Sequence, residues 1–182
     1  MRRTVAAGAG IVAVGVLTLH LMGHRVWCAC GSPAPWSGDI WSAHNSQHLV
    51  DPYTLTHLLH GVLYYALLRW LLGPRWPHAR VLIALCLEVT WEIIENTPAV
   101  IARYRATAAT GYTGDTIANS LGDIAASLLG YLAAMSLPAL VSAAGVVAVE
   151  AVLLLTIRDS LLLNVLMLLH PIEAIKRWQL AG

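Results

Sequence analysis

The segment Glu88-Val-Thr-Trp-Glu92-Ile-Ile-Glu95 places three carboxylates in one of the most apolar stretches of a 182-residue chain. On a helix, residues three or four positions apart share one face, so the three acids would form a single stripe. An ionised acid at the centre of a bilayer costs roughly 2.5–3.5 kcal/mol on insertion scales. The stripe therefore predicts an inward-facing site in which the acidic charge is compensated.

Two further polar stripes lie in neighbouring apolar segments. Their members, all at helical spacing, are His57, His60 and Tyr64 in one segment and Asp115, Asn119 and Asp123 in the other. Counted at a rise of about 1.5 Å per residue, the three stripes begin at one membrane surface and reach similar depths. Glu150 reaches the deeper level from the opposite side. Four helices are thus expected to direct polar groups into one pocket that opens toward the outer face.

Histidines and carboxylates on facing helices suit a divalent metal such as zinc, iron or manganese. We assign His57, His60 and Glu92 as candidate metal ligands, and Glu88 or Asp123 as a candidate general base. The remaining pocket residues are expected to be Tyr64, Glu95, Asp115, Asn119 and Glu150. A bound metal would activate water against an ester or phosphate of a lipid or lipid-linked substrate.

The same stripes also fit two functions without catalysis. In transport components, acidic residues in a membrane pocket bind a proton or another cation without breaking bonds. Asn119 and Asp123 would also suit a structural subunit, because polar side chains hydrogen-bond neighbouring helices in membranes. The sequence leaves open whether the protein is an enzyme.

The elements that must position these residues are membrane helices. Hydrophobic residues make up 58% of the chain and charged residues 12%, with a mean hydropathy of +0.66. Soluble domains carry about twice that charged fraction. We therefore predict an all-α, polytopic transmembrane helical bundle that forms a single integral membrane domain over residues 1–182. The net charge of +1 gives no basic field for nucleic acid, so membrane lipids are the expected partners.

About five spans are expected, at residues 4–22, 54–72, 81–97, 115–135 and 139–157. Asp51-Pro52 is typical of a helix start, and Gly73-Pro74 is typical of a helix end. Residues 99–114 are interpreted as a loop that is partly helical at most. Residues 159–177 fit either an interfacial amphipathic helix or a short sixth span. Gly122, Ala126 and Gly130 recur every four residues and predict close helix packing.

The longest polar loop, residues 23–51, carries three tryptophans and two of the three cysteines. Cys28 and Cys30 form a C-x-C, Cys86 is alone, and the three do not make a zinc-type pair of pairs. The C-x-C fits a disulfide and two free thiols equally well. His44 and His48 are interpreted as ordinary histidines of a surface loop, with a lid over the pocket as the alternative.

The motifs of this chain resemble a known family. The segments "GDIWSAHNSQHLVDPYTLTHLLHG", "EVTWEIIENTP" and "GYTGDTIANSLGD" are similar to those of an uncharacterised UPF-type family of bacterial inner-membrane proteins. The resemblance covers about residues 36–131 and implies the same location for this chain, without implying an activity.

A more distant resemblance is to VanZ-like membrane proteins. Their pattern of a His in one span, a Glu in the next and D-x-x-x-N-x-x-G at the start of another matches three sets of residues. These are His57 or His60, Glu88 or Glu92, and Asp115-Thr-Ile-Ala-Asn119-Ser-Leu-Gly122. The chain departs from that pattern in Glu95, Asp123, a second glycine only at Gly130 and the long first loop. The resemblance implies a helical bundle with an outward pocket and names no reaction.

Lys and Arg near the spans predict the orientation. Arg2, Arg3, Arg69, Arg75 and Arg80 place the N-terminus and the second connector in the cytoplasm. Arg25, Arg103 and Arg105 oppose this assignment. The basic start and first apolar run also resemble a signal peptide, but the run is long and we interpret it as an uncleaved anchor. The protein is thus expected to be a multi-pass protein of the bacterial inner membrane.

Overall fold

The computed structural model describes residues 2–181, which form eight α-helices and no β-strand beyond one isolated bridge, between Trp36 and Val50. The helices are α1 (Arg2–Leu21), α2 (Thr54–Leu72), α3 (Pro77–Glu95), α4 (Pro98–Ala106), α5 (Ile117–Ser136), α6 (Ala139–Ile157), α7 (Leu161–Leu169) and α8 (Glu173–Leu180). The prediction of an all-α fold is confirmed.

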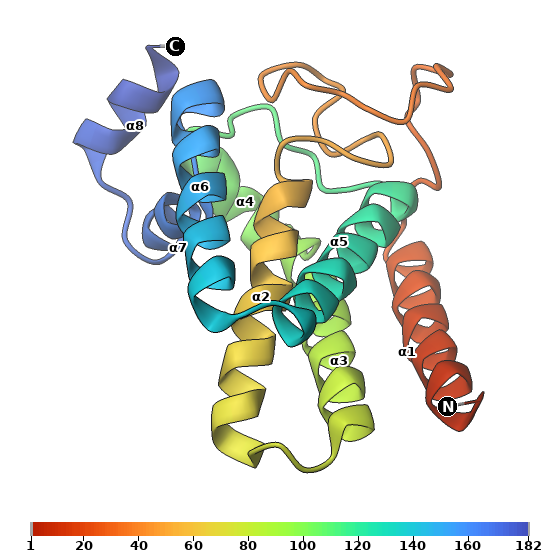
Figure 1. Ribbon diagram of the computed structural model, residues 1–182. Coiled ribbons are helices and arrows are strands. Elements are labelled where there is room, and N and C mark those ends of the chain that lie inside the picture. The colour runs from red at the N-terminus through yellow and green to blue at the C-terminus, as the bar shows by residue number, and fades with distance from the viewer. Residues whose placement is uncertain (1, 182) are drawn as a thin grey trace.

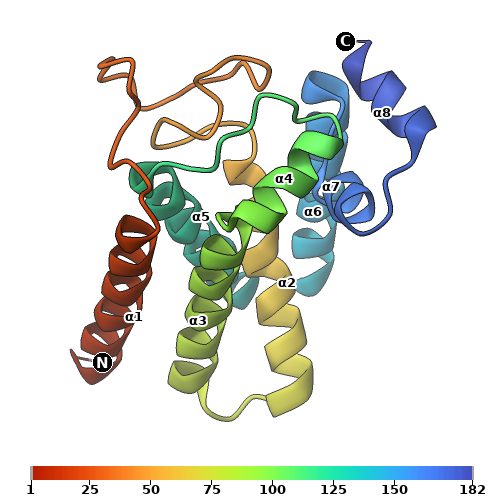
Figure 2. The same ribbon diagram turned by 180° about the vertical axis from the view of Figure 1, so that it is seen from behind.

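Five long helices, α1, α2, α3, α5 and α6, form the body of the molecule (Figures 1 and 2). The loop between α1 and α2 lies at one end of the bundle, together with α4, α7 and α8. The start of α1 and the α2–α3 connector lie at the other end. Chain segments that are far apart in sequence therefore meet at the loop end of the bundle.

Three helices, α1, α5 and α6, are long and apolar enough to cross a membrane by length and composition. Helix α6 leaves Leu140 82% and Leu155 85% exposed, as expected of side chains that contact lipid. Helices α2 and α3 have 19 residues each but do not meet the same criterion. They carry the histidine and glutamate stripes, and these polar residues lower the mean hydropathy of the two helices.

Several elements begin or end differently from the expected spans. Helix α3 starts at Pro77, so Arg80 belongs to the helix and is only 4% exposed, with its guanidinium 5.9 Å from the Tyr65 ring centroid. Residues 99–114, interpreted from the sequence as a loop that is partly helical, contain most of α4, whose first turn is capped by the Thr97 side chain, and residues 107–114 are not helical. Residues 159–177 contain α7 and the start of α8, of nine and eight residues, and neither helix is long enough to span a membrane.

The tightest helix pairing joins α2 to α5. A Cβ atom on Gly61 of α2 would collide with the backbone of Ser127 and Tyr131, and one on Gly130 of α5 would collide with the Leu58 carbonyl. Small residues let helix backbones approach closely where lipid provides little hydrophobic drive. The expected close packing around Gly130 is therefore present, and its partner is α2.

Gly61→Val and Gly130→Val should each lower the thermal stability of the detergent-solubilised protein, because both force α2 and α5 apart. Overpacking of this kind costs about 1–3 kcal/mol. Gly145→Ala in α6 is the control, since a Cβ there meets nothing within 4 Å. Melting temperatures from tryptophan fluorescence provide the measurement, and equal values for all four proteins would contradict the proposed packing.

Candidate functional site

A cluster of buried acids surrounds one histidine where α2, α3 and α5 meet. His57 Nδ1 lies 2.7 Å from Glu88 Oε1 and 3.3 Å from Glu92 Oε1. On the other side of the ring, His57 Nε2 lies 3.9 Å from Asp123 Oδ2. The exposed fractions are 5% for His57, 0% for Glu88, 1% for Glu92 and 2% for Asp123. The three stripes therefore converge as predicted from the sequence.

Glu88 bonds both histidines of the α2 stripe. Its Oε1 pairs with His57, and its Oε2 lies 3.2 Å from His60 Nδ1. The His60 ring also contacts Tyr64 and the edge of Trp91, at centroid distances of 5.9 and 6.0 Å. Because Glu88 occupies one nitrogen of each imidazole, it fixes the orientation of both rings.

Glu92 and Asp123 are less well satisfied than Glu88. Both carboxylate oxygens of Glu92 and Oδ1 of Asp123 are buried without a hydrogen-bond partner. Glu92 Oε1 is near His57 Nδ1, but that nitrogen is directed at Glu88. Buried carboxylates without partners are costly, so a proton or a cation is needed to compensate them.

Within residues 2–181, every ion pair that these carboxylates make is with a histidine. Two overlapping sets of side chains bring their ligand atoms within 4.8 Å of one another: His57, His60 and Glu88, and His57, Glu92 and Asp123. Three acids around two imidazoles thus form a donor set suited to a divalent metal.

The polar network continues from the cluster to the loop end of the bundle. Asn119 Nδ2 lies 3.4 Å from Asp51 Oδ2, and the Asp51 carboxylate also accepts hydrogen bonds from the amides of Tyr53, just before α2, and of Thr54, its first residue. Asp115 and Asn96 bond reciprocally: Asn96 Nδ2 donates to Asp115 Oδ2 at 2.8 Å, and the Asp115 amide donates to Asn96 Oδ1 at 2.6 Å. Burial raises the pKa of Asp51, and the nearby charge of Asp115 raises it further.

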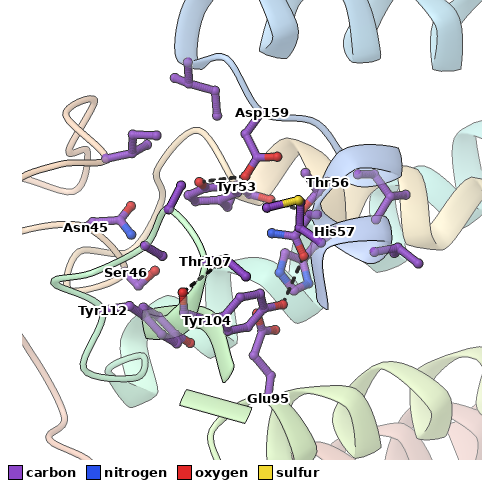
Figure 3. Close-up of a pocket in the computed structure, with 18 of the residues that line it drawn as sticks. Asn45, Ser46, Tyr53, Thr56, His57, Glu95, Tyr104, Thr107, Tyr112 and Asp159 are labelled. Carbon is purple, nitrogen blue, oxygen red and sulfur yellow. Dashed lines mark hydrogen bonds between the residues drawn. The ribbon is translucent and has the colours of Figure 1, made fainter. Parts of the chain in front are cut away.

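A cavity of 270 Å³ adjoins the cluster. Its polar side includes His57, His60, Glu95, Asp115 and Asp123. Other parts of its wall are apolar and come from α6 and α7, namely Ile157, Leu161, Val165 and Met167. Figure 3 shows several of these side chains around the cavity, with Tyr53 bonded to Asp159 at one side. The cavity can therefore hold a molecule with both a polar and an apolar part.

Six of the predicted pocket residues line this cavity: His57, His60, Tyr64, Glu95, Asp115 and Asp123. Glu88 and Glu92 lie beside it at His57, whereas Asn119 bonds Asp51 outside the cavity wall. Glu150 lies elsewhere. Its carboxylate accepts hydrogen bonds from the Leu161 and Leu162 amides at 2.9 and 3.3 Å, at the start of α7. The expectation that Glu150 faces the pocket is wrong, because the unpaired amides of a helix N-terminus attract a carboxylate.

Sequence reasoning missed several polar residues of the site. His24 places Nδ1 2.9 Å from the Asp115 carbonyl and Nε2 3.1 Å from the Asn96 carbonyl, which links the end of α1 to the network. The Tyr112 hydroxyl donates to Asp115, and that of Tyr53 donates to Asp159. The tyrosines and Asp159 lie outside the periodic stripes, so no spacing pattern could have found them.

The chain matches a family described as "Protein of unknown function (DUF2585)" over residues 19–181. The chain belongs to this family. It is 43% identical to a UPF0314 protein of Sphingopyxis alaskensis over 175 residues, which cover 96% of this chain and 93% of that protein. It is also 47% identical to a UPF0314 protein of Rhizobium meliloti, over 93% of this chain and 87% of the relative.

A UPF0314 protein of Paracoccus denitrificans is 44% identical over 94% of this chain and 89% of the relative. No solved structure matches the chain. The uncharacterised family expected from the motifs is thus confirmed, while the comparisons do not show a similarity to VanZ-like proteins.

Asp159 gives the cavity wall a measurable pH dependence. Burial raises the pKa of Asp159 from 3.8 to about 6, although the Ser160 amide and the Tyr53 hydroxyl donate to the carboxylate. The pKa of Asp159 is higher in the folded protein than in the unfolded chain, so protonated Asp159 favours folding. Its contribution to the free energy of unfolding is complete below about pH 4. It is lost as the pH rises through about 6.

Asp159→Asn should therefore raise the melting temperature at pH 7.5 by several degrees and flatten its dependence between about pH 4 and 7. The asparagine keeps an acceptor for the Ser160 amide and removes the buried charge. Asp39→Asn, in the exposed part of the first loop, is the control and should leave the profile unchanged. A wild-type profile that rises with pH across this range would show that Asp159 is stabilised as the anion.

Proposed function

We propose that the protein is a metal-dependent membrane enzyme that acts on a lipid or lipid-linked amphiphile. The observation that carries this proposal is that His57 and Asp123 belong both to the acidic cluster and to the cavity wall. A cation held by the cluster would face a molecule bound in the cavity. The VanZ-like resemblance names no reaction and adds only the expectation of an outward pocket.

The geometry favours His57, Glu92 and Asp123 as the ligand set. Glu88 takes Nδ1 of His57, so Nε2, which faces Asp123, is the nitrogen left for a cation. The unpaired oxygens of Glu92 and Asp123 supply the remaining donors. Glu88, one of the two candidate bases from the sequence, is better placed to orient the histidines, as a carboxylate behind a metal-bound imidazole does.

Glu95 provides a proton acceptor beside this ligand set. It lies three residues beyond Glu92 on α3, lines the cavity, and has a buried Oε2 without a hydrogen-bond partner. A divalent metal bound nearby would supply Lewis acidity and lower the pKa of a coordinated water. Glu95 would then take the proton from water or from a substrate hydroxyl group.

The cavity wall supports an amphiphilic substrate. The polar end of such a molecule would meet the acids and histidines, and its apolar part would contact Val165 and Met167 of α7. We place α1, α5 and α6 across the bacterial inner membrane, with the N-terminus in the cytoplasm. The cavity would then lie near the periplasmic surface of the inner membrane. Substrate would enter there from the outer leaflet.

Glu92→Gln and Asp123→Asn should each lower the bound metal by one equivalent per chain, because each removes a charged ligand. Elemental analysis of the full-length protein in detergent measures this loss. Both variants should also lose any hydrolysis of lipids in vesicles of phosphatidylethanolamine, phosphatidylglycerol and a polyprenyl diphosphate, followed by mass spectrometry. Glu173→Gln, on the exposed face of α8, is the control for both measurements.

Two outcomes would replace this proposal. Folded wild-type protein that binds no metal in this cluster and is destabilised by Glu92→Gln would indicate a polar network that only fixes helix packing. A Glu92→Gln variant that alters pH-dependent ion flux in vesicles, with no lipid converted by the wild type, would indicate proton or cation transport.

A further inference from the structure

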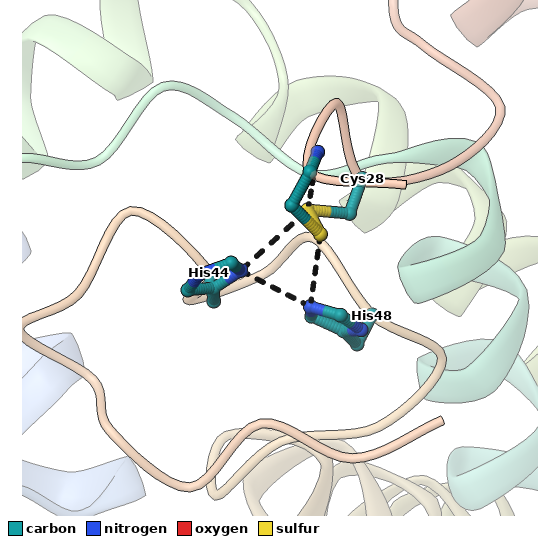
Figure 4. A group of neighbouring side chains, drawn as sticks. Cys28, His44 and His48 are labelled. Carbon is teal, nitrogen blue, oxygen red and sulfur yellow. Dashed lines mark hydrogen bonds between the residues drawn. A yellow bond between two sulfur atoms is a disulfide. The ribbon is translucent and has the colours of Figure 1, made fainter. Parts of the chain in front are cut away.

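A second cluster of metal-binding side chains lies in the loop between α1 and α2, away from the acidic cluster. Cys28 and Cys30 face His44 and His48 across the loop, and one donor atom from each lies within 4.8 Å of the other three. Figure 4 shows the two imidazoles directed at the cysteine turn. The two pairs are separated by 13 residues in sequence, so the fold of the loop brings them together.

Three of the sulfur-to-nitrogen and nitrogen-to-nitrogen distances in this cluster are close to those of a tetrahedral zinc site. With Zn–S bonds of about 2.3 Å and Zn–N bonds of about 2.0–2.1 Å, a regular tetrahedron separates S from N by about 3.6 Å and N from N by about 3.3 Å. Cys28 Sγ lies 3.6 Å from His44 Nδ1, and Cys30 Sγ lies 3.9 Å from His48 Nε2. His44 Nδ1 and His48 Nε2 are 3.3 Å apart.

The surroundings of His48 hold its ring in the orientation of a ligand. Nδ1 bonds the Ala34 carbonyl at 2.5 Å, so the proton of the neutral ring belongs on Nδ1 and the Nε2 lone pair faces the cluster. The Trp27 ring meets the imidazole edge-on at a centroid distance of 5.8 Å. Metal-bound histidines characteristically donate their second nitrogen to a carbonyl or carboxylate.

The two sulfur atoms are paired as a disulfide in this structure. A bridge between residues two apart in sequence closes a very short loop and restricts the unfolded chain little. A thiol or phosphine reductant that gives two electrons to this bridge releases two thiolates. These supply two soft ligands, which select zinc over the hard cations suited to a carboxylate cluster. Cys30 and His44 are exposed, so an ion can reach the site from solvent.

We propose that Cys28, Cys30, His44 and His48, with the cysteines as thiolates, form a structural Zn²⁺ site that fastens the loop over the cavity. The segment between the two histidines provides the link to the cavity, because Asn45 and Ser46 line it. Ser46 and Gln47 also bond to the chain just before α5: the Thr116 amide donates to the Ser46 carbonyl at 3.0 Å, and Gln47 Nε2 donates to the Gly114 carbonyl at 2.8 Å. Zinc would tie both ends of this segment to the cysteine turn.

A zinc ion at this position would stabilise a loop that has little regular secondary structure. Its described residues form no helix, and one isolated bridge is its only β-pairing, yet it holds buried polar side chains. Long irregular loops in compact domains are uncommon without a functional or structural constraint. Four ligands with no open position are typical of a structural zinc site, whose binding energy contributes to folding.

The test uses full-length protein purified in detergent with a phosphine reductant, stripped by a chelator and dialysed against Zn²⁺. The background is Glu92→Gln, so that metal in the acidic cluster is not counted. One equivalent of zinc should bind, and it should be lost in Cys28→Ser/Cys30→Ser and in His44→Asn/His48→Asn. Cys86→Ser and His170→Asn are the matched controls at exposed positions and should retain it.

Three further readouts do not depend on how well the variants fold. Zn²⁺ should slow alkylation of Cys28 and Cys30 in the otherwise unmutated chain by about tenfold or more, because a bound thiolate is not free to react. It should also reduce amide exchange over residues 40–50. Co²⁺ in place of zinc should show thiolate-to-metal charge-transfer absorption.

Zinc that remains in both double variants, or alkylation that Zn²⁺ does not slow, would overturn the loop site. So would binding of Cu⁺ with no measurable binding of Zn²⁺. None of these results bears on the acidic cluster, since that cluster is disabled in the dialysis experiment and contains no cysteine.

Discussion

The structure depends on the burial of three carboxylates around a single imidazole inside an apolar helical bundle. Glu88, Glu92 and Asp123 come from two helices, and His57 comes from a third. Only Glu88 is fully engaged by the histidines, while the other two retain unpaired oxygens. A bundle that only needed to pack would use smaller, neutral polar groups at this depth, since each buried carboxylate must be compensated.

The close approach of α2 and α5 makes this cluster possible. Because Gly61 and Gly130 allow the two backbones to touch, His57 can reach Asp123 across the interface. Helix α3 then adds Glu88 and Glu92 from a third direction. The glycines thus set the dimensions of the polar site, although neither contacts it through a side chain.

The two candidate metal sites differ in ways that match their locations. The acidic cluster offers oxygen and imidazole donors beside a cavity, which suits a metal with an open coordination position. The loop brings two cysteines and two imidazoles together near the surface, and with the cysteines as thiolates they would form a closed set of four ligands, which suits a structural ion. The segment Asn45–Ser46 joins them, because it lies between two loop histidines and also lines the cavity.

The sequence by itself determined the helical class and the members of the three polar stripes. Helical periodicity is local, so His57, Glu92 and Asp123 could each be assigned to an inward face from their own segment. Tertiary structure alone decided which acid is paired, because that depends on how three helices dock. It also placed Glu150 at the start of α7 and brought the cysteines to the loop histidines. Glu150 and the start of α7 share no helical repeat, because a turn of the chain separates them. The cysteines and histidines lie in an irregular loop, where no repeat predicts which side chains will meet.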